Sequence, residues 1–319
     1  GLTHLDRKDV GVEALGYVIE NRALGAALMQ RLEQQDNVDL VCPATVTQVA
    51  TTDDLATLQC SGNGEDVTLH GKLLVIADGG RSGLREKLGF ESSIDDYQQS
   101  AIVCNVTPGL FHQHCAYERF TASGPLAILP MNGDRCWCVW AVAAEDVEDY
   151  MTLSEEQFLV RLQQQFGDRL GRFSRVGKRY VYPLARSRAE KHYRRRAVLV
   201  GNAAQSVHPV AAQGFNLALR DVAWLAEVLA QAYANNEDHG AEGVLAEYED
   251  IRHRDTRRVT SFTHGMIKLF TSQLPPLIAG RNMGLLAVDL LPEVKRALLK
   301  RTMGLSGRQS RLARGLLLK

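Results

Sequence analysis

This 319-residue chain lacks the marks of several common protein classes. Its 37 Lys and Arg residues are matched by 37 Asp and Glu residues, so the net charge does not indicate a nucleic-acid partner. The sequence shows neither an apolar run of transmembrane length nor a signal-peptide pattern. The six cysteines are scattered and do not have the spacing of a disulfide framework, which favours a reducing compartment. We therefore expect a cytoplasmic protein.

Metal-ligating residue types occur in two short clusters. Cys136 and Cys138 stand two residues apart in a strand-like run, so their side chains point to one face. His112, His114 and Cys115 lie nearby in the sequence. Structural zinc takes four ligands, and a core or solvated position explains these side chains without a metal. We expect no metal ion.

The dinucleotide-binding fingerprint G-x-G-x-x-G is also absent. The stretch Gly62-Asn63-Gly64 lacks the third glycine and lies in a hairpin-like context. This fingerprint opens the first strand–helix–strand unit of dinucleotide-binding folds, and the chain begins with Gly1 rather than Met. We therefore expect that an N-terminal segment is missing from this chain.

The strongest pattern that is present lies in residues 196–222. Ala197 to Val200 is typical of a strand buried on both faces, and a turn follows at Gly201-Asn202. A helix that begins just after Gly214 aims unpaired N–H groups and a partial positive charge at whatever lies before it. The stretch therefore predicts a binding site for an anion or an electron-rich ring.

A second strand–turn–helix pattern covers residues 72–89. A buried strand from Leu73 to Ala77 ends in Asp78-Gly79, and Ser82 is a good N-cap for a short helix. An Asp-Gly pair at the carboxyl end of a parallel strand lies where open α/β sheets bind ligands. An ordinary capped turn, in which Arg85 pairs with the aspartate, is the alternative.

Together the two patterns resemble the flavin motifs of the FAD-dependent aromatic hydroxylases, the p-hydroxybenzoate hydroxylase-like family. In that family the upstream motif is Asp-Gly-x-x-Ser-x-x-Arg, and the downstream motif is Gly-Asp-Ala-Ala-His, a Pro, and Gly-Gln-Gly-x-Asn. About 120 residues separate the two motifs here, as in the family. The resemblance implies cofactor binding by the matching residues, which are Asp78, Gly79, Ser82, Arg85, Gly201, Asn202, Ala203, Pro209, Gln213, Gly214, Phe215 and Asn216.

Three positions depart from the family pattern. Asn202 replaces an Asp, Gln205 replaces a His, and Ala212 replaces a Gly. The amide of Asn202 can still hydrogen-bond a ribityl hydroxyl, although it has no charge. The Asn and the Gln are similar to the ubiquinone-biosynthesis branch of the family. An ordinary α/β strand–loop–helix unit is the alternative.

The resemblance implies a function as well. It implies an FAD-dependent monooxygenase that uses NAD(P)H and O2 to hydroxylate a polyprenylated methoxyphenol in ubiquinone biosynthesis, through a flavin C4a-hydroperoxide. Other ubiquinone-biosynthesis proteins are implied partners, and no catalytic side chain is evident. Two alternatives stay open: a flavoprotein hydroxylase or reductase of another phenol or isoprenoid, and a non-catalytic fragment that serves as an interaction module. The absent fingerprint motivates the last, because FAD would lose a helix terminus at its phosphates.

The order of elements predicts an α/β (α+β) fold with a partial Rossmann-like lobe. Residues 1–98 and 187–240 are expected to form an FAD-binding lobe that contains a β-meander, with strands at 38–50, 55–60 and 66–70. Residues 99–186 are expected to form an inserted antiparallel sheet, and 241–319 to form C-terminal helices with a basic tail.

In the resembling family the inserted sheet is the floor of the aromatic substrate pocket. The aromatic or rigid residues that the resemblance implies for substrate contact are Tyr117, Phe120, Pro130 and Trp140. The two-residue period of a strand puts Trp140 on the same face as Cys136 and Cys138, and Trp137 on the other. Core packing is the alternative for each.

The basic tail is the last feature. Residues 293–319 contain only Glu293 against the basic residues Lys295, Arg296, Lys300, Arg301, Arg308, Arg311, Arg314 and Lys319. From Arg308 onward Arg and Leu alternate irregularly, which is typical of a basic amphipathic helix on an anionic membrane surface or a partner. We therefore expect peripheral contact with the inner face of the membrane. A frayed, solvated terminus is the alternative.

Overall fold

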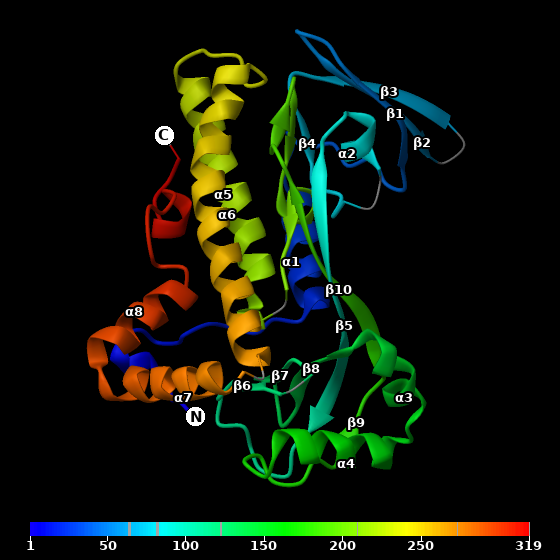
Figure 1. The fold of residues 1–319 in the computed structure, drawn as a ribbon. Coiled ribbons are helices and arrows are strands. Elements are labelled where there is room, and N and C mark those ends of the chain that lie inside the picture. Colours follow the sequence, from blue (N-terminus) through cyan, green and yellow to red (C-terminus); the bar gives the residue numbers. More distant parts are fainter. Residues whose placement is uncertain (63–64, 81–82, 122, 209, 273, 319) are drawn as a thin grey trace. The chain divides into compact units, whose positions relative to one another are not determined.

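The computed structural model describes residues 1–62, 65–80, 83–121, 123–208, 210–272 and 274–318 (Figure 1). The chain divides into two compact units. Unit 1 contains Gly1–Gln30, Asp96–Ala185 and Thr263–Ser306, and unit 2 contains Arg31–Asp95, Arg186–Phe262 and Gly307–Lys319. Both units combine helices with strands, which confirms the predicted α/β class.

Unit 2 contains the predicted β-meander. Its antiparallel strands are β1 (Thr45–Thr51), β2 (Ala56–Gly62) and β3 (Glu65–Gly71), in the order β1-β2-β3. The first strand begins at Thr45 rather than at residue 38. Val46 and Val49 of β1 pack against a buried cluster that includes Ile76 and Phe90. The meander therefore covers part of the core beneath the second sheet of the same unit.

The second sheet of unit 2 holds the two motif strands side by side. β4 (Leu74–Ile76) and β12 (Ala197–Leu199) are parallel, and β11 (Tyr193–Arg194) pairs with β12 on its other edge. All three β12 residues are fully buried, as their continuous apolar run predicts. Because β4 and β12 run in the same direction, the loops that follow them leave from the same edge of the sheet.

Two long helices complete the core of unit 2. α5 (Gln213–Ala234) buries Trp224, Leu225 and Val228, and α6 (Glu242–Thr271) contributes Leu245 and Tyr248 to the same cluster. The two helices lie side by side in Figure 1. The sequence places them at 216–234 and 241–272, so both helices are confirmed. The last turns of α6 belong to unit 1.

Unit 1 is built on the predicted antiparallel sheet. The strand order is β13-β10-β5-β8-β7-β6, with β9 also paired to β5. The strands are β5 (Ser92–Thr107), β6 (Tyr117–Phe120), β7 (Pro125–Pro130), β8 (Cys136–Ala143), β9 (Arg175–Val176) and β10 (Tyr180–Ala189). The first residues of β5 and the last of β10 belong to unit 2, where β10 pairs with β13 (Gln205–Ser206).

Helix α4 (Glu155–Phe166) covers one face of this sheet. Its N-terminus is a capping box in which Ser154 and Gln157 exchange side-chain to backbone hydrogen bonds. Phe158 and Leu162 of α4 pack on fully buried Trp140 and its neighbours in the sheet. A short helix, α3 (Val147–Thr152), precedes α4.

The remaining helices of unit 1 lie near the chain ends. α7 (Pro275–Leu290) and α8 (Pro292–Thr302) both begin at proline, which has no N–H to leave unpaired. Asp289 of α7 accepts a 2.7 Å hydrogen bond from Thr3 and pairs with Lys295 of α8 at 3.4 Å. α1 (Asn21–Glu33) has no buried residue. These contacts explain why the first 30 residues cluster with unit 1.

The unit boundaries can be compared with the predicted domains. Unit 1 includes 96–185, which nearly coincides with the predicted insertion at 99–186. It also includes 1–30 and 263–306, while 307–319 clusters with unit 2. Long-range packing of the chain ends, which has no local signal, decides these assignments. In the part of the chain that the structure describes, no helix has the length and apolarity needed to span a membrane.

The basic tail is not the continuous amphipathic helix that the sequence suggests. From Arg308 onward, the helical part of the described tail is one 3-10 turn, η5 (Leu312–Arg314). Gly307 and Gly315 adopt φ values of +93° and +70°, and this left-handed backbone interrupts a helix on both sides. Ser310 is only 2% exposed, so the segment is packed on unit 2 rather than frayed.

Candidate functional site

The two predicted motifs meet in unit 2 through Arg85. This side chain is 6% exposed, and its Nη1 donates to the backbone oxygen of Ala203 (3.3 Å) and to Oγ of Ser187 (3.4 Å). Its Nε and Nη2 donate to the carboxylate of Glu86 at 3.2 and 3.0 Å. A backbone N–H and the Arg85 guanidinium together keep the pKa of Glu86 below its ordinary value. Arg85 therefore fixes the upstream motif to the downstream turn.

The upstream turn combines a side-chain hydrogen bond with two left-handed glycines. Oδ1 of Asp78 accepts a 2.7 Å hydrogen bond from the N–H of Gly80. Gly79 and Gly80 have φ values of +74° and +75°, which other residues rarely adopt. A Cβ on Gly80 would lie 3.4 Å from the backbone oxygen of Asn202, whereas a Cβ on Gly79 would meet no atom of the described residues within 4 Å. The turn thus touches the downstream motif, and the described residues leave space above Gly79.

The short helix after this turn is α2 (Leu84–Lys87), as the sequence predicts. The predicted cap, Ser82, lies outside the described residues. Gly83, with a φ of 72°, precedes the first helical residue.

The downstream turn is held by a buried ion pair. Gly201 has a φ of +60°, and its N–H donates to Oδ2 of Asp221 at 2.9 Å. Oδ1 of Asp221 accepts from Nε of Arg252 at 2.6 Å, and Arg252 also donates to Asp255 at 2.6 Å. Arg252 is fully buried, and Asp221 is 1% exposed. Burial raises the pKa of Asp221, while Arg252 opposes that rise.

Sequence reasoning missed Arg252 and Asp255. Both lie on α6, some 30 residues beyond the motif, where charged residues at helical spacing are typical of a solvated face. Only the tertiary packing of α6 against α5 brings Arg252 to Asp221. Asp221 itself lies within the stretch 196–222 that holds the downstream motif.

Gln205 has hydrogen-bonding groups that nothing in the described chain uses. The residue is 4% exposed, and both its Nε2 and its Oε1 lack a hydrogen-bond partner among the described residues. A buried amide without partners costs about 1–3 kcal/mol, so a polar ligand would relieve it. Together with the open space at Gly79, this observation fits a polar cofactor such as FAD.

Helix α5 begins slightly before the predicted start just after Gly214. Ala212 precedes it in the left-handed conformation (φ 48°, ψ 39°), and Gln213 is its first residue. Phe215 and Asn216 lie exposed in the first turn, whose N–H groups have no helical partner. Among the described residues, a Cβ on Gly214 would meet Val207 alone, at 3.7 Å. The predicted ring contact, Pro209, lies outside the described residues.

His208 is not placed as a general base. It is 1% exposed, and its Nδ1 accepts a 3.2 Å hydrogen bond from the N–H of Val210. Burial lowers the pKa of His208 to about 4, so the ring is neutral near pH 7. Its role is to shape the loop before α5.

The predicted substrate residues divide between the two faces of the unit 1 sheet. Trp140 is fully buried on the face that α4 covers, where its ring centroid lies 4.8 Å from that of Tyr150. Tyr117 packs on Phe166 on the same face, and Pro130 pairs with Cys136 there. Phe120 instead lies on the face away from α4 and stacks on Phe270 of α6, with centroids 4.0 Å apart. Trp137 also lies on that second face, as the strand period predicts.

Glu118 is a third residue that sequence reasoning missed. It stands on the same face as Phe120, opposite Ala127 of β7, which in turn pairs with Val139 of β8. Its side chain is exposed at the sheet face, yet the surrounding protein desolvates the carboxylate and raises the pKa of Glu118 to about 7. An acid beside apolar sheet residues can serve as a polar anchor for a ligand.

Among the described residues, no group of three or more His, Cys, Asp or Glu side chains is arranged to hold a metal ion. Cys136 and Cys138 are fully buried in the sheet core.

Comparison with known proteins identifies the class first. A family described as "FAD binding domain" matches residues 17–263, and the chain belongs to this family. Over 304 residues, which cover 94% of this chain and 70% of the relative, it is 38% identical to ubiquinone hydroxylase UbiL of Rhodospirillum rubrum. It is 32% identical to 3-demethoxyubiquinol 3-hydroxylase of Escherichia coli, covering 94% of this chain and 76% of that one. The predicted relation to the ubiquinone branch of the flavin hydroxylases is confirmed.

A solved structure shows the fold. The crystal structure of p-nitrophenol 4-monooxygenase PnpA from Pseudomonas putida matches with a TM-score of 0.75 at 21% identity, over 91% of this chain and 73% of that chain.

Proposed function

We propose that the chain forms part of an FAD-dependent monooxygenase that hydroxylates a polyprenylated methoxyphenol, such as 2-polyprenyl-6-methoxyphenol, in ubiquinone biosynthesis. The observation that supports it most is the joining of two flavin motifs by Arg85 in a chain 38% identical to a ubiquinone hydroxylase. NAD(P)H is the electron donor in this proposal. A flavin reductase would share the same motifs but would not place oxygen on the ring.

FAD, when bound, supplies the activation of O2 that no side chain provides. The residues proposed to hold it are those that converge in unit 2. The open backbone at Gly79 admits a close approach, and the carboxylate of Asp78 and the amide of Asn202 offer partners for hydroxyl groups. The N-terminus of α5 directs the positive end of the helix dipole toward negative charge on a bound group. The hydrogen bonds of Arg85 to Ala203 and of Gly201 to Asp221 hold the upstream turn, the downstream turn and α5 together.

For the substrate we propose the sheet face away from α4. Phe120 offers an aromatic surface on that face, and Glu118 offers a hydrogen-bonding group for a phenol hydroxyl. In this proposal Tyr117, Pro130 and Trp140 shape the sheet from its α4 face rather than touch the substrate.

A polyprenyl phenol is largely apolar, so the proposed enzyme meets its substrate at a membrane surface. Leucines of the C-terminal segment support peripheral contact, because Leu312, Leu316 and Leu317 are 43%, 38% and 84% exposed. We propose contact at the inner, cytoplasmic face, together with other ubiquinone-biosynthesis proteins.

The Arg85 variant tests the flavin assignment. Arg85→Lys retains the charge but loses the fork that reaches Ala203 and Ser187 together, so FAD affinity should fall about tenfold or more. Arg169→Lys, at an exposed position of unit 1, is the matched control and should leave affinity unchanged. The measurement is titration of flavin fluorescence with each purified protein. Equal FAD affinity for both variants and the parent would contradict the role of Arg85.

A further inference from the structure

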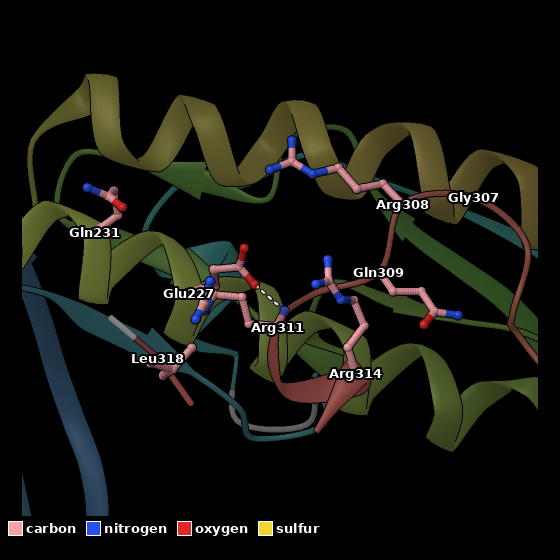
Figure 2. A pocket seen from close by; sticks show the side chains of 8 residues that line it. All are labelled: Glu227, Gln231, Gly307, Arg308, Gln309, Arg311, Arg314 and Leu318. Atoms are coloured by element: carbon pink, nitrogen blue, oxygen red, sulfur yellow. Dashed lines mark hydrogen bonds between the residues drawn. The ribbon is translucent and has the colours of Figure 1, made fainter. Parts of the chain in front are cut away.

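A pocket of about 590 Å³ lies in unit 2, away from the flavin motifs (Figure 2). Glu227 and Gln231 of α5 line it from one side, and Arg308, Arg311 and Arg314 line it from the C-terminal segment. Glu227 stands 14 residues after the first residue of α5, which is about 20 Å along the helix. The pocket is therefore distinct from the proposed FAD site.

The backbone of the segment is fixed on α5. The N–H of Arg311 donates to the carboxylate of Glu227, as the dashed line in Figure 2 shows. Ser310 is buried, and its Oγ accepts a 3.2 Å hydrogen bond from the N–H of Ala313. The guanidinium of Arg308 lies 5.1 Å from the ring centroid of Trp224 of α5. The arginines are thus presented by an ordered turn and not by a loose tail.

Positive charge in the pocket is not balanced. Across the described residues, no carboxylate forms an ion pair with Arg308, Arg311 or Arg314. The carboxylate of Glu227, which lines the same pocket, is engaged by a backbone N–H. Nε of Arg311 donates to the backbone oxygen of Leu317 at 2.8 Å. Three guanidinium groups on one pocket repel each other unless an anion joins them.

We propose that this arginine pocket binds a phosphate group. The planar fork of a guanidinium donates two parallel hydrogen bonds to a phosphate, and Gln231 adds amide donors. The pocket of about 590 Å³ has room for an organic group attached to the phosphate. Leu318 lines the pocket, and Leu317 beside it is 84% exposed. A phospholipid headgroup and a soluble phosphate ester offer the same phosphate chemistry to these side chains.

Two variants and a control test the pocket itself. The triple variant Arg308→Gln, Arg311→Gln, Arg314→Gln should weaken binding of sn-glycerol 3-phosphate by about tenfold or more, measured by isothermal titration. The control is a second triple variant, Arg169→Gln, Arg172→Gln, Arg175→Gln, which removes three positive charges at exposed positions of unit 1. It should bind sn-glycerol 3-phosphate as tightly as the parent protein.

Glu227→Gln should change the affinity for phosphate in the opposite direction. The Gln Oε1 still accepts the hydrogen bond from the Arg311 N–H, but the negative charge is removed, so phosphate binding should tighten by roughly threefold or more. This gain separates a binding pocket from a segment that the triple variant merely unfolds. Equal weakening by the triple variant and the control, or no gain from Glu227→Gln, would overturn the proposal.

Vesicles then distinguish the two sources of phosphate. The protein is sedimented with vesicles of phosphatidylcholine alone and of phosphatidylcholine with phosphatidylglycerol, with and without inorganic phosphate. Binding to the anionic vesicles that the triple variant loses and inorganic phosphate displaces supports the headgroup. Titratable glycerol phosphate binding without vesicle binding supports a soluble ester. Absence of both, in a protein that still binds FAD, refutes the pocket and leaves the proposed oxygenase untouched.

Discussion

Replacement of Arg252 by Met should destabilise unit 2 more than any surface change. Arg252 is fully buried and donates 2.6 Å hydrogen bonds to both Asp221 and Asp255. Methionine fills much of the volume but leaves the buried Asp221 carboxylate without its counter-charge. Loss of one partner of a buried pair costs about 3–5 kcal/mol, so the free energy of unfolding should fall by that amount near pH 7.

The loss in the free energy of unfolding that Arg252→Met causes should become smaller at lower pH. Burial already raises the pKa of Asp221 in the folded protein, and removal of the guanidinium raises it further. A carboxyl whose folded pKa lies above its unfolded value stabilises the fold at low pH, and this contribution is lost as pH rises through the folded pKa. The penalty of Arg252→Met should therefore shrink as pH is lowered from about 8 to about 5.

Urea unfolding of the single and double variants provides the measurement. Asp221→Asn combined with Arg252→Met removes both charges, so it should recover part of the stability that Arg252→Met loses. The Asn side chain retains an oxygen for the Gly201 N–H. A loss below about 1 kcal/mol for Arg252→Met, or no recovery in the double variant, would refute the buried ion pair as the support of the Gly201 turn.

Three further changes have defined outcomes. Ala212→Gly removes the strain of a left-handed backbone at φ 48°, so it should increase the free energy of unfolding by up to about 1 kcal/mol and raise the melting temperature. A lower melting temperature would contradict the left-handed conformation of Ala212. Glu118→Gln should flatten the pH dependence of the melting temperature between about 4.5 and 7, since a raised pKa stabilises only at low pH. The parent protein should lose stability as pH falls from 6.5 toward 4, because the buried, neutral His208 ring gains a proton only on unfolding. His208→Asn should remove this loss, as pH-dependent thermal unfolding of both proteins would show.

Local patterns in the sequence predicted the parts of the fold that local physics determines. The apolar run from Ala197 to Val200 predicted a strand with two covered faces, and the observed strand β12 is fully buried. The glycines of both motifs predicted turns, and the structure shows left-handed backbone there at Gly79 and Gly201. The buried strand and the glycine turns are determined by residues close together in the sequence, so the sequence alone predicts them.

Long-range partners were not predictable in the same way. The sequence pattern around Arg252 is typical of a solvated helix face. Only the packing of α6 on α5 brings Arg252 to Asp221. The strand period separated Trp140 from Trp137, but only the position of α4 decides which face is the core. The tail has an Arg and Leu pattern that favours a helix, whereas Gly307 and the contact of Arg311 with Glu227 impose an irregular segment.

The central claim is that the flavin fold serves oxygen transfer to a phenol. The most direct measurement is the mass of the product formed from a polyprenyl methoxyphenol by the FAD-loaded protein with NAD(P)H under isotopically labelled O2. We predict a hydroxylated ring that contains one labelled oxygen atom, in an amount that matches the NAD(P)H oxidised. NAD(P)H oxidation with no labelled product would show a reductase and contradict the claim.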